Sequence, residues 1–335
     1  MLNFIEKIKE KTDLWQKLQK TKKPIVLYGM GDGAEKVIHY LSLYGKKPNA
    51  VFASDDFVRG QQFLGYTVKK YADIVNEYGD FIVLVAFGTQ LPEVIDNILR
   101  INSQRETYAP NVPLFGEGLF NIDYIKKHES EFAEVYNNLA DSKSQEIFLN
   151  LCNYSISGKI EYLMNSVTEK AEAHRILNLG SEEVYLDLGA YNGDTVLEFA
   201  DYTKKQYKQI LAVEPDGKNF KKFLKNTEQL PNVTGINYGI WQEKAELFFS
   251  SKAGRNSALT TKGSRPVHCL SVDDIACEYT KNPITYIKMD VEGVEKAALT
   301  GAKKTIQNDK PKMLVSAYHR NEDLFTLPLL IWQYN

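Results

Sequence analysis

A short apolar run in the rear half of the chain ends in an acidic residue and a glycine-containing turn. Residues 184–195 read VYLDLGAYNGDT, so Asp187 comes near the end of the run, and Gly189 and Gly193 follow it. Glycine permits a sharp turn because it has no Cβ, and free backbone N–H groups beside a helix start can donate to a ligand. The string predicts a strand, a ligand-binding turn and a helix. The turn residues expected to bind are Gly189, Ala190, Tyr191 and Gly193.

A second carboxylate, Glu214, stands at the end of the next apolar run, in the string AVEP. A carboxylate at the tip of a parallel strand can accept two hydrogen bonds from a ribose diol, which is how such folds hold a nucleoside. Pro215 ends the strand, and Asp216 can cap the helix that follows. The two strand ends together predict a nucleoside-binding site.

The charge of the turn indicates which nucleoside fits. Dinucleotide-binding turns prefer G-x-G-x-x-G, but here Tyr191 stands at the second glycine position and Asp187 precedes the turn. An acidic turn repels a diphosphate and attracts a cation. The ammonium and sulfonium groups of S-adenosylmethionine are such cations, so this cofactor is expected and a dinucleotide is not.

A longer string carries a family resemblance. Residues 287–295 read IKMDVEGVE, with Gly301-Ala302 and Lys310-Pro311 behind them. Together with DLGAYNGDT and VEPD, these strings resemble the FkbM-type methyltransferase family over about residues 180–330. The resemblance implies an S-adenosylmethionine-dependent enzyme that O-methylates hydroxyls of sugars or natural products. It also implies roles for single residues: the methionine part on Asp187, Gly189 and Gly193, the ribose on Glu214, the adenine along Ile240, and the transferring methyl near Asp290.

Methyl transfer from a sulfonium is an in-line displacement, so the protein mainly positions the reactants. An alcohol acceptor must also lose its proton, which a carboxylate or a histidine can take. The candidates are Asp290 as positioning residue or base, His319 as base, and Glu292, which could instead cap the helix that begins near Gly293. Glu295 can be an ordinary solvated helix residue. No metal site is predicted, because no firm set of three ligands stands out in the sequence.

The front of the chain has its own glycine-rich turn, GMGDG, with Gly29, Gly31 and Gly33 after an apolar run. It could bind the phosphates of a nucleotide or nucleotide sugar, with Asp55 or Asp56 at the ribose. Alternatively, the glycines serve only a tight turn, which is favoured because Asp32 would repel phosphate. A nucleotide-sugar-binding or NAD-binding sugar-modifying protein that acts through this part, or a catalytically silent scaffold, are the alternative functions.

Apolar runs alternate with helical patterns, which is typical of parallel α/β sheets. With 335 residues, two domains are expected: two Rossmann-like, doubly wound α/β domains at 1–118 and 181–335, the second class I methyltransferase-like, joined by a helical connector at 119–180. Within the connector, Ser142 and Gln145 match a capping box. The rear strands are expected at 184–189, 209–215, 233–240, 284–291 and 312–319, and a hairpin and loop at 244–275. Methyltransferase sheets usually continue beyond a fifth strand, so a truncated or incomplete sheet is expected.

Composition limits the partners and the location. The net charge of −2 gives no reason to expect nucleic acid or a membrane surface. The three cysteines form no C-x-x-C pair, which favours a reducing cytoplasm. Residues 1–20 have lysines throughout and predict an amphipathic helix, not a signal peptide. The expected partner is a small-molecule or saccharide acceptor, and a homodimer is a further expectation.

Overall fold

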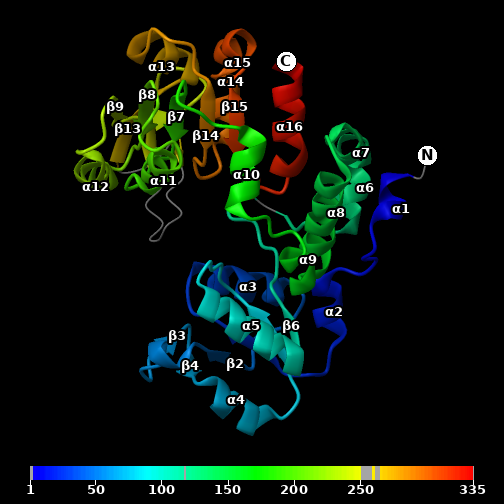
Figure 1. Ribbon diagram of the computed structural model, residues 1–335. Coiled ribbons are helices and arrows are strands. Elements are labelled where there is room, and N and C mark those ends of the chain that lie inside the picture. Colours follow the sequence, from blue (N-terminus) through cyan, green and yellow to red (C-terminus); the bar gives the residue numbers. More distant parts are fainter. Residues whose placement is uncertain (1–2, 117, 250–258, 261–264, 335) are drawn as a thin grey trace. The chain divides into compact units, whose positions relative to one another are not determined.

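The computed structural model describes residues 3–116, 118–249, 259–260 and 265–334 (Figure 1). The chain divides into two compact units. The front unit comprises residues 1–113 and 117–167, and the rear unit comprises 114–116 and 168–335. This division differs from the expected one, because most of the helical segment 119–180 belongs to the front unit.

The front unit contains a sheet with strand order β3-β4-β2-β1-β5-β6. Its neighbouring strands are parallel except for the antiparallel β3/β4 pair. All four residues of the central strand β1 are buried, since both of its faces are covered by helices. The strands are β1 (Ile25–Tyr28), β2 (Ala50–Phe52), β3 (Gln62–Phe63), β4 (Tyr66–Lys69), β5 (Ile82–Val85) and β6 (Glu106–Tyr108).

Alternate residues of β1 pack into two different cores, which makes this unit doubly wound. Ile25 and Leu27 pack with residues of α2 and α3, and Val26 and Tyr28 pack with residues of α4 and α5. The 3₁₀ helix η1 (Asp55–Phe57) follows β2. The helices are α2 (Leu14–Lys20), α3 (Asp32–Leu43), α4 (Tyr71–Tyr78) and α5 (Pro92–Gln104).

The N-terminal segment is not one amphipathic helix. It forms the short α1 (Phe4–Lys7) and, after a break, α2. Phe4 stacks on Phe132 of α7 at 5.7 Å between ring centroids, so α1 joins the helices that follow β6. In this group, Asp141 caps α8 by accepting from the N–H of Ser144 at 2.8 Å. The capping box expected for Ser142 and Gln145 is therefore wrong. The helices are α6 (Ile122–Lys127), α7 (Glu129–Asn138), α8 (Ser142–Ser157) and α9 (Ile160–Met164).

The rear unit is built on a parallel sheet of strand order β15-β14-β7-β8-β9. Its first strand, β7, lies in the centre, and the strand order reverses between β7 and β14. Ligands of open α/β sheets bind outside the carboxyl ends of the strands at such a reversal. The strands are β7 (Val184–Leu188), β8 (Gln209–Val213), β9 (Val233–Ile236), β14 (Tyr286–Met289) and β15 (Lys312–Val315).

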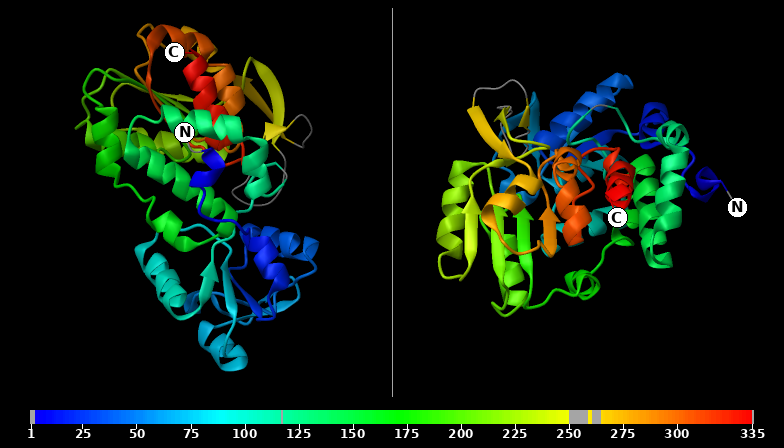
Figure 2. Two further views of the ribbon diagram at one scale, coloured as in Figure 1. Left: turned by 90° about the vertical axis from the view of Figure 1, so that its right-hand side faces the viewer. Right: turned by 90° about the horizontal axis from the view of Figure 1, so that it is seen from above.

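Helices cover both faces of the rear sheet (Figures 1 and 2). Tyr185 of β7 packs with residues of α11 and α12, whereas Leu186 packs with residues of α13 to α16. The α/β fold class with Rossmann-like units is therefore confirmed. The rear helices are α10 (Lys170–Leu177), α11 (Asp194–Tyr202), α12 (Gly217–Thr227), α13 (Val272–Tyr279), α14 (Glu295–Thr300), α15 (Lys303–Asp309) and α16 (Asp323–Tyr334).

A second rear sheet has the order β10-β13-β11-β12. The expected single strand 233–240 is wrong, because it is split between β9 in the main sheet and β10 (Gly239–Ile240) here. The expected hairpin is present as the antiparallel pair β11 (Ala245–Phe249) and β13 (Arg265–Leu270), with β12 (Leu259–Thr260) beside β11. Part of the expected loop, at 250–258 and 261–264, lies outside the described residues.

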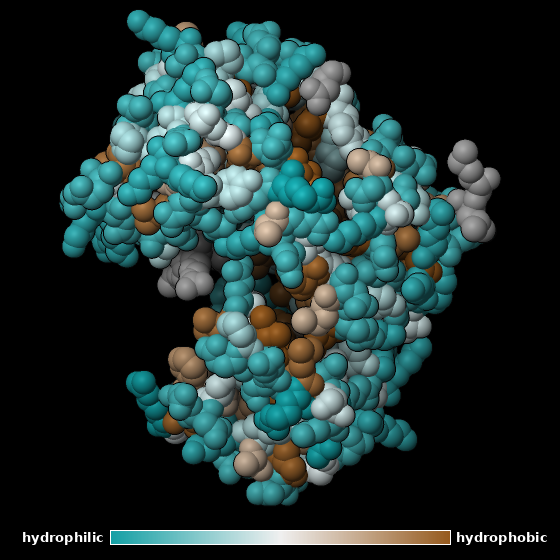
Figure 3. Space-filling model, viewed as in Figure 1, coloured by the Kyte–Doolittle hydropathy of each residue, from teal (hydrophilic) through white to brown (hydrophobic). Residues whose placement is uncertain are grey.

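Among the described residues, no helix is both long enough and apolar enough to cross a membrane. In the view of Figure 3 hydrophilic residues predominate on the surface of each unit. The large apolar side chains mostly lie in the cores described above.

Candidate functional site

The turn after β7 lies directly against the residue that follows β14. Gly189 has φ +86°, and a Cβ at this position would lie 2.0 Å from the backbone oxygen of Asp290. Its N–H donates to Val213 O at 3.0 Å, which ties the turn to β8 as well. Only glycine fits at this point. The close approach brings the carboxyl ends of β7, β8 and β14 together, as the parallel sheet predicts.

The rest of the turn sets the start of α11. Gly193, with φ +91°, precedes this helix, and a Cβ there would lie 3.0 Å from Thr227 Cγ2 of α12. The glycine thus lets α11 pack closely on α12. Ala190 is fully buried, whereas Tyr191 has φ +47° and is 49% exposed. The ring of Tyr191 is therefore available to a ligand.

Asp187 does not face the solvent. Its side chain is 0% exposed, and Lys288 Nζ of β14 lies 3.2 Å from its Oδ1. Thr195 donates from its hydroxyl to Oδ2, and Lys288 also donates to Gly189 O at 3.0 Å. This finding corrects the expectation that Asp187 gives the turn a free negative charge, because Lys288 neutralises it. Asp187 instead holds the turn from inside.

Glu214 follows β8 and is 7% exposed. It accepts from the N–H of Tyr191 at 2.9 Å on Oε2 and from the N–H of Asp216 at 2.8 Å on Oε1. Burial raises the pKa of its carboxyl to about 7, although these two hydrogen bonds act in the opposite direction. An ionised carboxylate has about four acceptor positions. Each oxygen of Glu214 therefore keeps one position for a further donor, as a diol requires.

The two remaining cofactor candidates are less suited to direct contact. Ile240 is 4% exposed and packs in the core with Ile236 and Leu270, so its main role is packing. Pro215 is partly buried and leads into α12, whose first N–H groups bond to Asp216 as expected.

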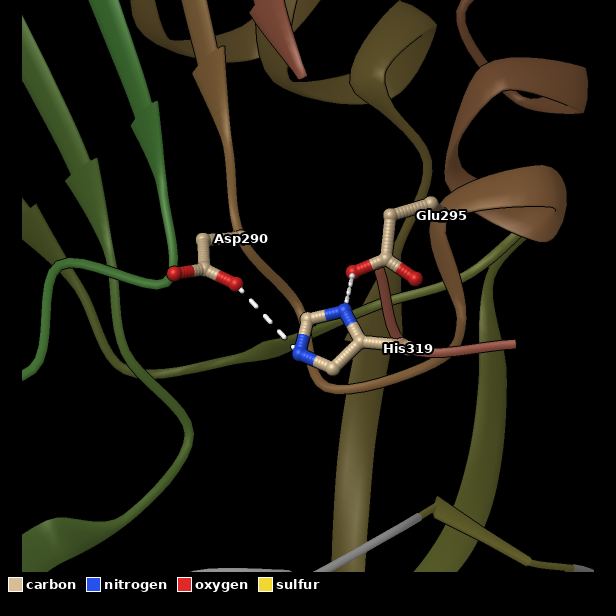
Figure 4. A group of neighbouring side chains, drawn as sticks. All are labelled: Asp290, Glu295 and His319. Atoms are coloured by element: carbon tan, nitrogen blue, oxygen red, sulfur yellow. Dashed lines mark ion pairs between the residues drawn. The ribbon is translucent and has the colours of Figure 1, made fainter. Parts of the chain in front are cut away.

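A second group of side chains gathers around His319, which follows β15 (Figure 4). The ring is 1% exposed. Its Nδ1 lies 2.9 Å from Glu295 Oε1, and its Nε2 lies 3.5 Å from both Asp290 Oδ1 and Glu292 Oε2. Tyr318 donates from its hydroxyl to Asp290 Oδ1 at 3.2 Å. The structure thus brings together all three predicted catalytic residues and adds Glu295 and Tyr318.

The protonation state of His319 follows from these neighbours. Burial alone would lower the pKa of the imidazole, but the carboxylates of Glu292 and Glu295 raise it to about 10. The ring is therefore an imidazolium at neutral pH and donates. A protonated ring cannot accept a proton, so the geometry contradicts the expected role of His319 as base.

Two interpretations of the neighbouring carboxylates are wrong. Glu292 does not cap a helix, because α14 begins at Glu295 with Val294 before it. It has the left-handed φ of +54° and directs its carboxylate to His319. Glu295 is not solvated: it is 1% exposed and accepts from Val291 N–H at 3.0 Å as well as pairing with His319.

A short segment far away in the sequence completes this corner. Residues 114–116 belong to the rear unit, and the N–H of Phe115 donates to His319 O at 3.2 Å. A Cβ at Gly293 would lie 2.7 Å from Phe115 Cδ2, so Gly293 makes room for this ring. The string VPLF contains no signal that would place it here.

The front glycines mainly serve close packing. A Cβ at Gly29 would lie 2.8 Å from Phe87 Cδ1, and one at Gly33 would lie 2.3 Å from Ala86 O. These distances explain both residues without a ligand. At Gly31 a Cβ would find open space, and Asp55 is exposed in η1. Phosphate binding by this turn stays a prediction.

The chain is similar to known methyltransferases, in its rear unit by sequence and over its whole length by fold. Residues 187–334 match the model of the methyltransferase FkbM domain. The whole chain is similar to the crystal structure of a methyltransferase FkbM from Methylobacillus flagellatus KT, with a TM-score of 0.68, 18% identity and 88% of that chain covered. Half of the chain aligns with precorrin-6Y C5,15-methyltransferase from Geobacter metallireducens GS-15, covering 72% of that chain at 12% identity and a TM-score of 0.33, too low to support an argument. No curated protein matches the chain.

Proposed function

Because residues 187–334 match the methyltransferase FkbM domain, we propose that the chain transfers a methyl group from S-adenosylmethionine to a hydroxyl of a saccharide or similar natural product. One observation supports the proposal: the glycine turn after β7 packs against the backbone of Asp290, whose carboxylate is partly exposed. Both reactants of a methyl transfer could meet at this edge of the sheet.

The residues fit the cofactor. Each oxygen of Glu214 keeps an acceptor position for one hydroxyl of the ribose diol. The turn Gly189–Gly193 would hold the methionine part, with Asp187 and Lys288 fixing the turn from within. Asp290 and Glu292 have side chains that are 35% and 46% exposed, and they supply the negative charge that the cationic sulfur favours. These two residues take the electrostatic role that the sequence had assigned to Asp187.

S-adenosylmethionine, when bound, supplies a methyl group on a positively charged sulfur. The protein must align the acceptor and remove the proton of its hydroxyl. Asp290 suits this step, because one oxygen faces His319 and the other points away from the ring (Figure 4). The second oxygen accepts the hydrogen bond of the acceptor and then its proton. His319 is a positioning residue that holds Asp290 and Glu292, while Glu295 fixes His319 itself.

The pKa of Glu214 leads to a pH prediction. Its carboxyl is protonated below about pH 7 and ionised above, and only the ionised form accepts from both hydroxyls of a ribose. The affinity for S-adenosylmethionine is expected to rise by up to about tenfold from about pH 6 to about pH 8. Glu214→Gln should bind at least about tenfold more weakly at the higher pH and lose the pH dependence.

Calorimetric titration at both pH values measures this effect. Glu243→Gln is the matched control, because Glu243 is an exposed carboxylate in the turn between β10 and β11. It should behave as the unaltered chain does. The ribose role of Glu214 is excluded if Glu214→Gln keeps the original affinity and pH profile.

The activity is tested by incubating the chain with methyl-labelled S-adenosylmethionine and a panel of saccharides and hydroxylated natural products. The expected result is label in a product that carries one additional O-methyl group. Transfer to nitrogen or carbon atoms alone would contradict the proposed acceptor class.

A further inference from the structure

The corner around His319 has more negative charge than its own side chains can neutralise. Three carboxylates, those of Asp290, Glu292 and Glu295, face one imidazole ring within 3.5 Å. Even a protonated ring neutralises only one of them. This concentration of negative charge around a buried ring favours the binding of a further cation.

The spacing of these atoms suits an ion. Ligand atoms of Asp290, Glu295 and His319 all lie within 4.8 Å of one another. Two ligands that bind one metal ion at about 2.1 Å lie about 3.0–3.4 Å apart in octahedral or tetrahedral geometry. His319 Nε2 lies 3.5 Å from Asp290 Oδ1 and from Glu292 Oε2. Each of these two oxygens therefore lies close to the ligand spacing from His319 Nε2.

One buried carboxylate oxygen of this corner lacks a hydrogen-bond partner among the described residues, which is a separate observation. Glu295 is 1% exposed. Its Oε1 pairs with His319 Nδ1 at 2.9 Å, but its Oε2 makes no hydrogen bond with any described residue. Buried polar atoms without partners are rare and call for an explanation such as a bound ion.

From these observations we propose that Asp290 Oδ1, Glu292 Oε2 and His319 Nε2 bind a divalent metal ion. Glu295 is the positioning residue, since a carboxylate on the second ring nitrogen orients histidine ligands in many metal sites. One imidazole with carboxylate oxygens suits ions such as Mn²⁺. Asp290 and Glu292 are partly exposed, so an ion can reach the site from solvent.

The role of the ion rests on the proposed function, although its binding does not. A divalent ion at this point would take the hydroxyl oxygen of the acceptor as a further ligand and make its proton easier to remove. Asp290 Oδ2 accepts from the Tyr318 hydroxyl at 3.4 Å and keeps a second acceptor position for that proton. To bind the ion through Nε2, His319 would release the proton of that nitrogen to solvent, as metal-binding histidines do.

The test is titration of the purified full chain with Mn²⁺ alone, following the free ion by electron paramagnetic resonance. One Mn²⁺ per chain is expected to bind. Asp290→Asn and Glu292→Gln should each weaken binding by at least about tenfold. Both side chains are partly exposed, so these variants are expected to fold, which circular dichroism checks. Glu243→Gln removes one exposed carboxylate elsewhere in the rear unit and should leave Mn²⁺ binding unchanged.

The inference is overturned if the unaltered chain takes up no Mn²⁺, or if Asp290→Asn and Glu292→Gln bind it as well as Glu243→Gln does. Titration with S-adenosylmethionine in the presence of a chelator separates this result from the proposed function. If the cofactor binds but Mn²⁺ does not, only the proposal of a metal site is excluded. If Mn²⁺ binds but S-adenosylmethionine does not, only the proposal of S-adenosylmethionine as cofactor is excluded.

Discussion

Asp290→Asn is expected to lower the rate of methyl transfer by about 100-fold to about 10,000-fold, the range that a general base contributes. The amide keeps the shape of the side chain but cannot accept the proton of the acceptor. It also removes one of the charges that face His319 Nε2. The measurement is kcat at saturating cofactor and acceptor.

The control for this variant is cofactor binding. Because Glu292 keeps its charge and Glu214 still faces the ribose, Asp290→Asn should still bind S-adenosylmethionine, with a loss of affinity far smaller than the loss of rate. Glu243→Gln should keep full activity. If Asp290→Asn retained a rate close to that of the unaltered chain, Asp290 would be a structural residue and the proposed mechanism would be wrong.

Glu295→Ala is expected to lower the free energy of unfolding by about 3–5 kcal/mol, as breaking a buried ion pair does. Burial alone would raise the pKa of Glu295, but the interaction with His319 lowers it below its ordinary value, so the pair is charged at neutral pH. Without Glu295, the buried imidazolium loses the carboxylate that lies 2.9 Å from its Nδ1. Urea unfolding at neutral pH, with a chelator present, measures the loss.

Glu198→Ala provides the comparison. Glu198 pairs with Lys170 at 2.7 Å, but the two side chains are 37% and 75% exposed. Exposed pairs stabilise proteins by at most about 1 kcal/mol. An equal loss of stability in the two variants would show that the Glu295–His319 pair is no more important than a surface contact.

The sequence was sufficient to locate the main functional edge. Asp187, Glu214 and Asp290 each follow or end an apolar run, and the carboxyl ends of parallel strands meet at one edge whatever the side chains do. What the sequence could not provide is the partner of each carboxylate. Lys288 neutralises Asp187 only because β14 lies beside β7 in register, with Lys288 opposite Asp187.

The role of His319 shows the same limit. Histidine after a strand is a reasonable base, but its protonation depends on Glu292 and Glu295, which the loop after β14 places around the ring. Phe115 reaches the same corner from the other half of the chain. Such contacts depend on tertiary packing, which local patterns do not contain.

The secondary structure was predicted well where strands and helices alternate and poorly where the pattern changes. Helix α13 was missed although Ser271 and Asp274 form a capping box in which Ser271 accepts from Asp274 N–H at 3.1 Å. The pattern S-x-x-D was present in the sequence. The split between β9 and β10 falls at Asn237 and Tyr238, and the polar Asn237 within the apolar run was a local signal that the prediction did not use.

Calorimetric titration of the purified chain with S-adenosylmethionine, NADH and a UDP-sugar in turn tests the central claim most directly. The turn after β7 and the carboxylate of Glu214 predict that one S-adenosylmethionine binds per chain and that NADH and the UDP-sugar do not compete with it. Heat from NADH or the UDP-sugar alone, with none from S-adenosylmethionine, would contradict a methyl-donor site at the tip of the rear sheet.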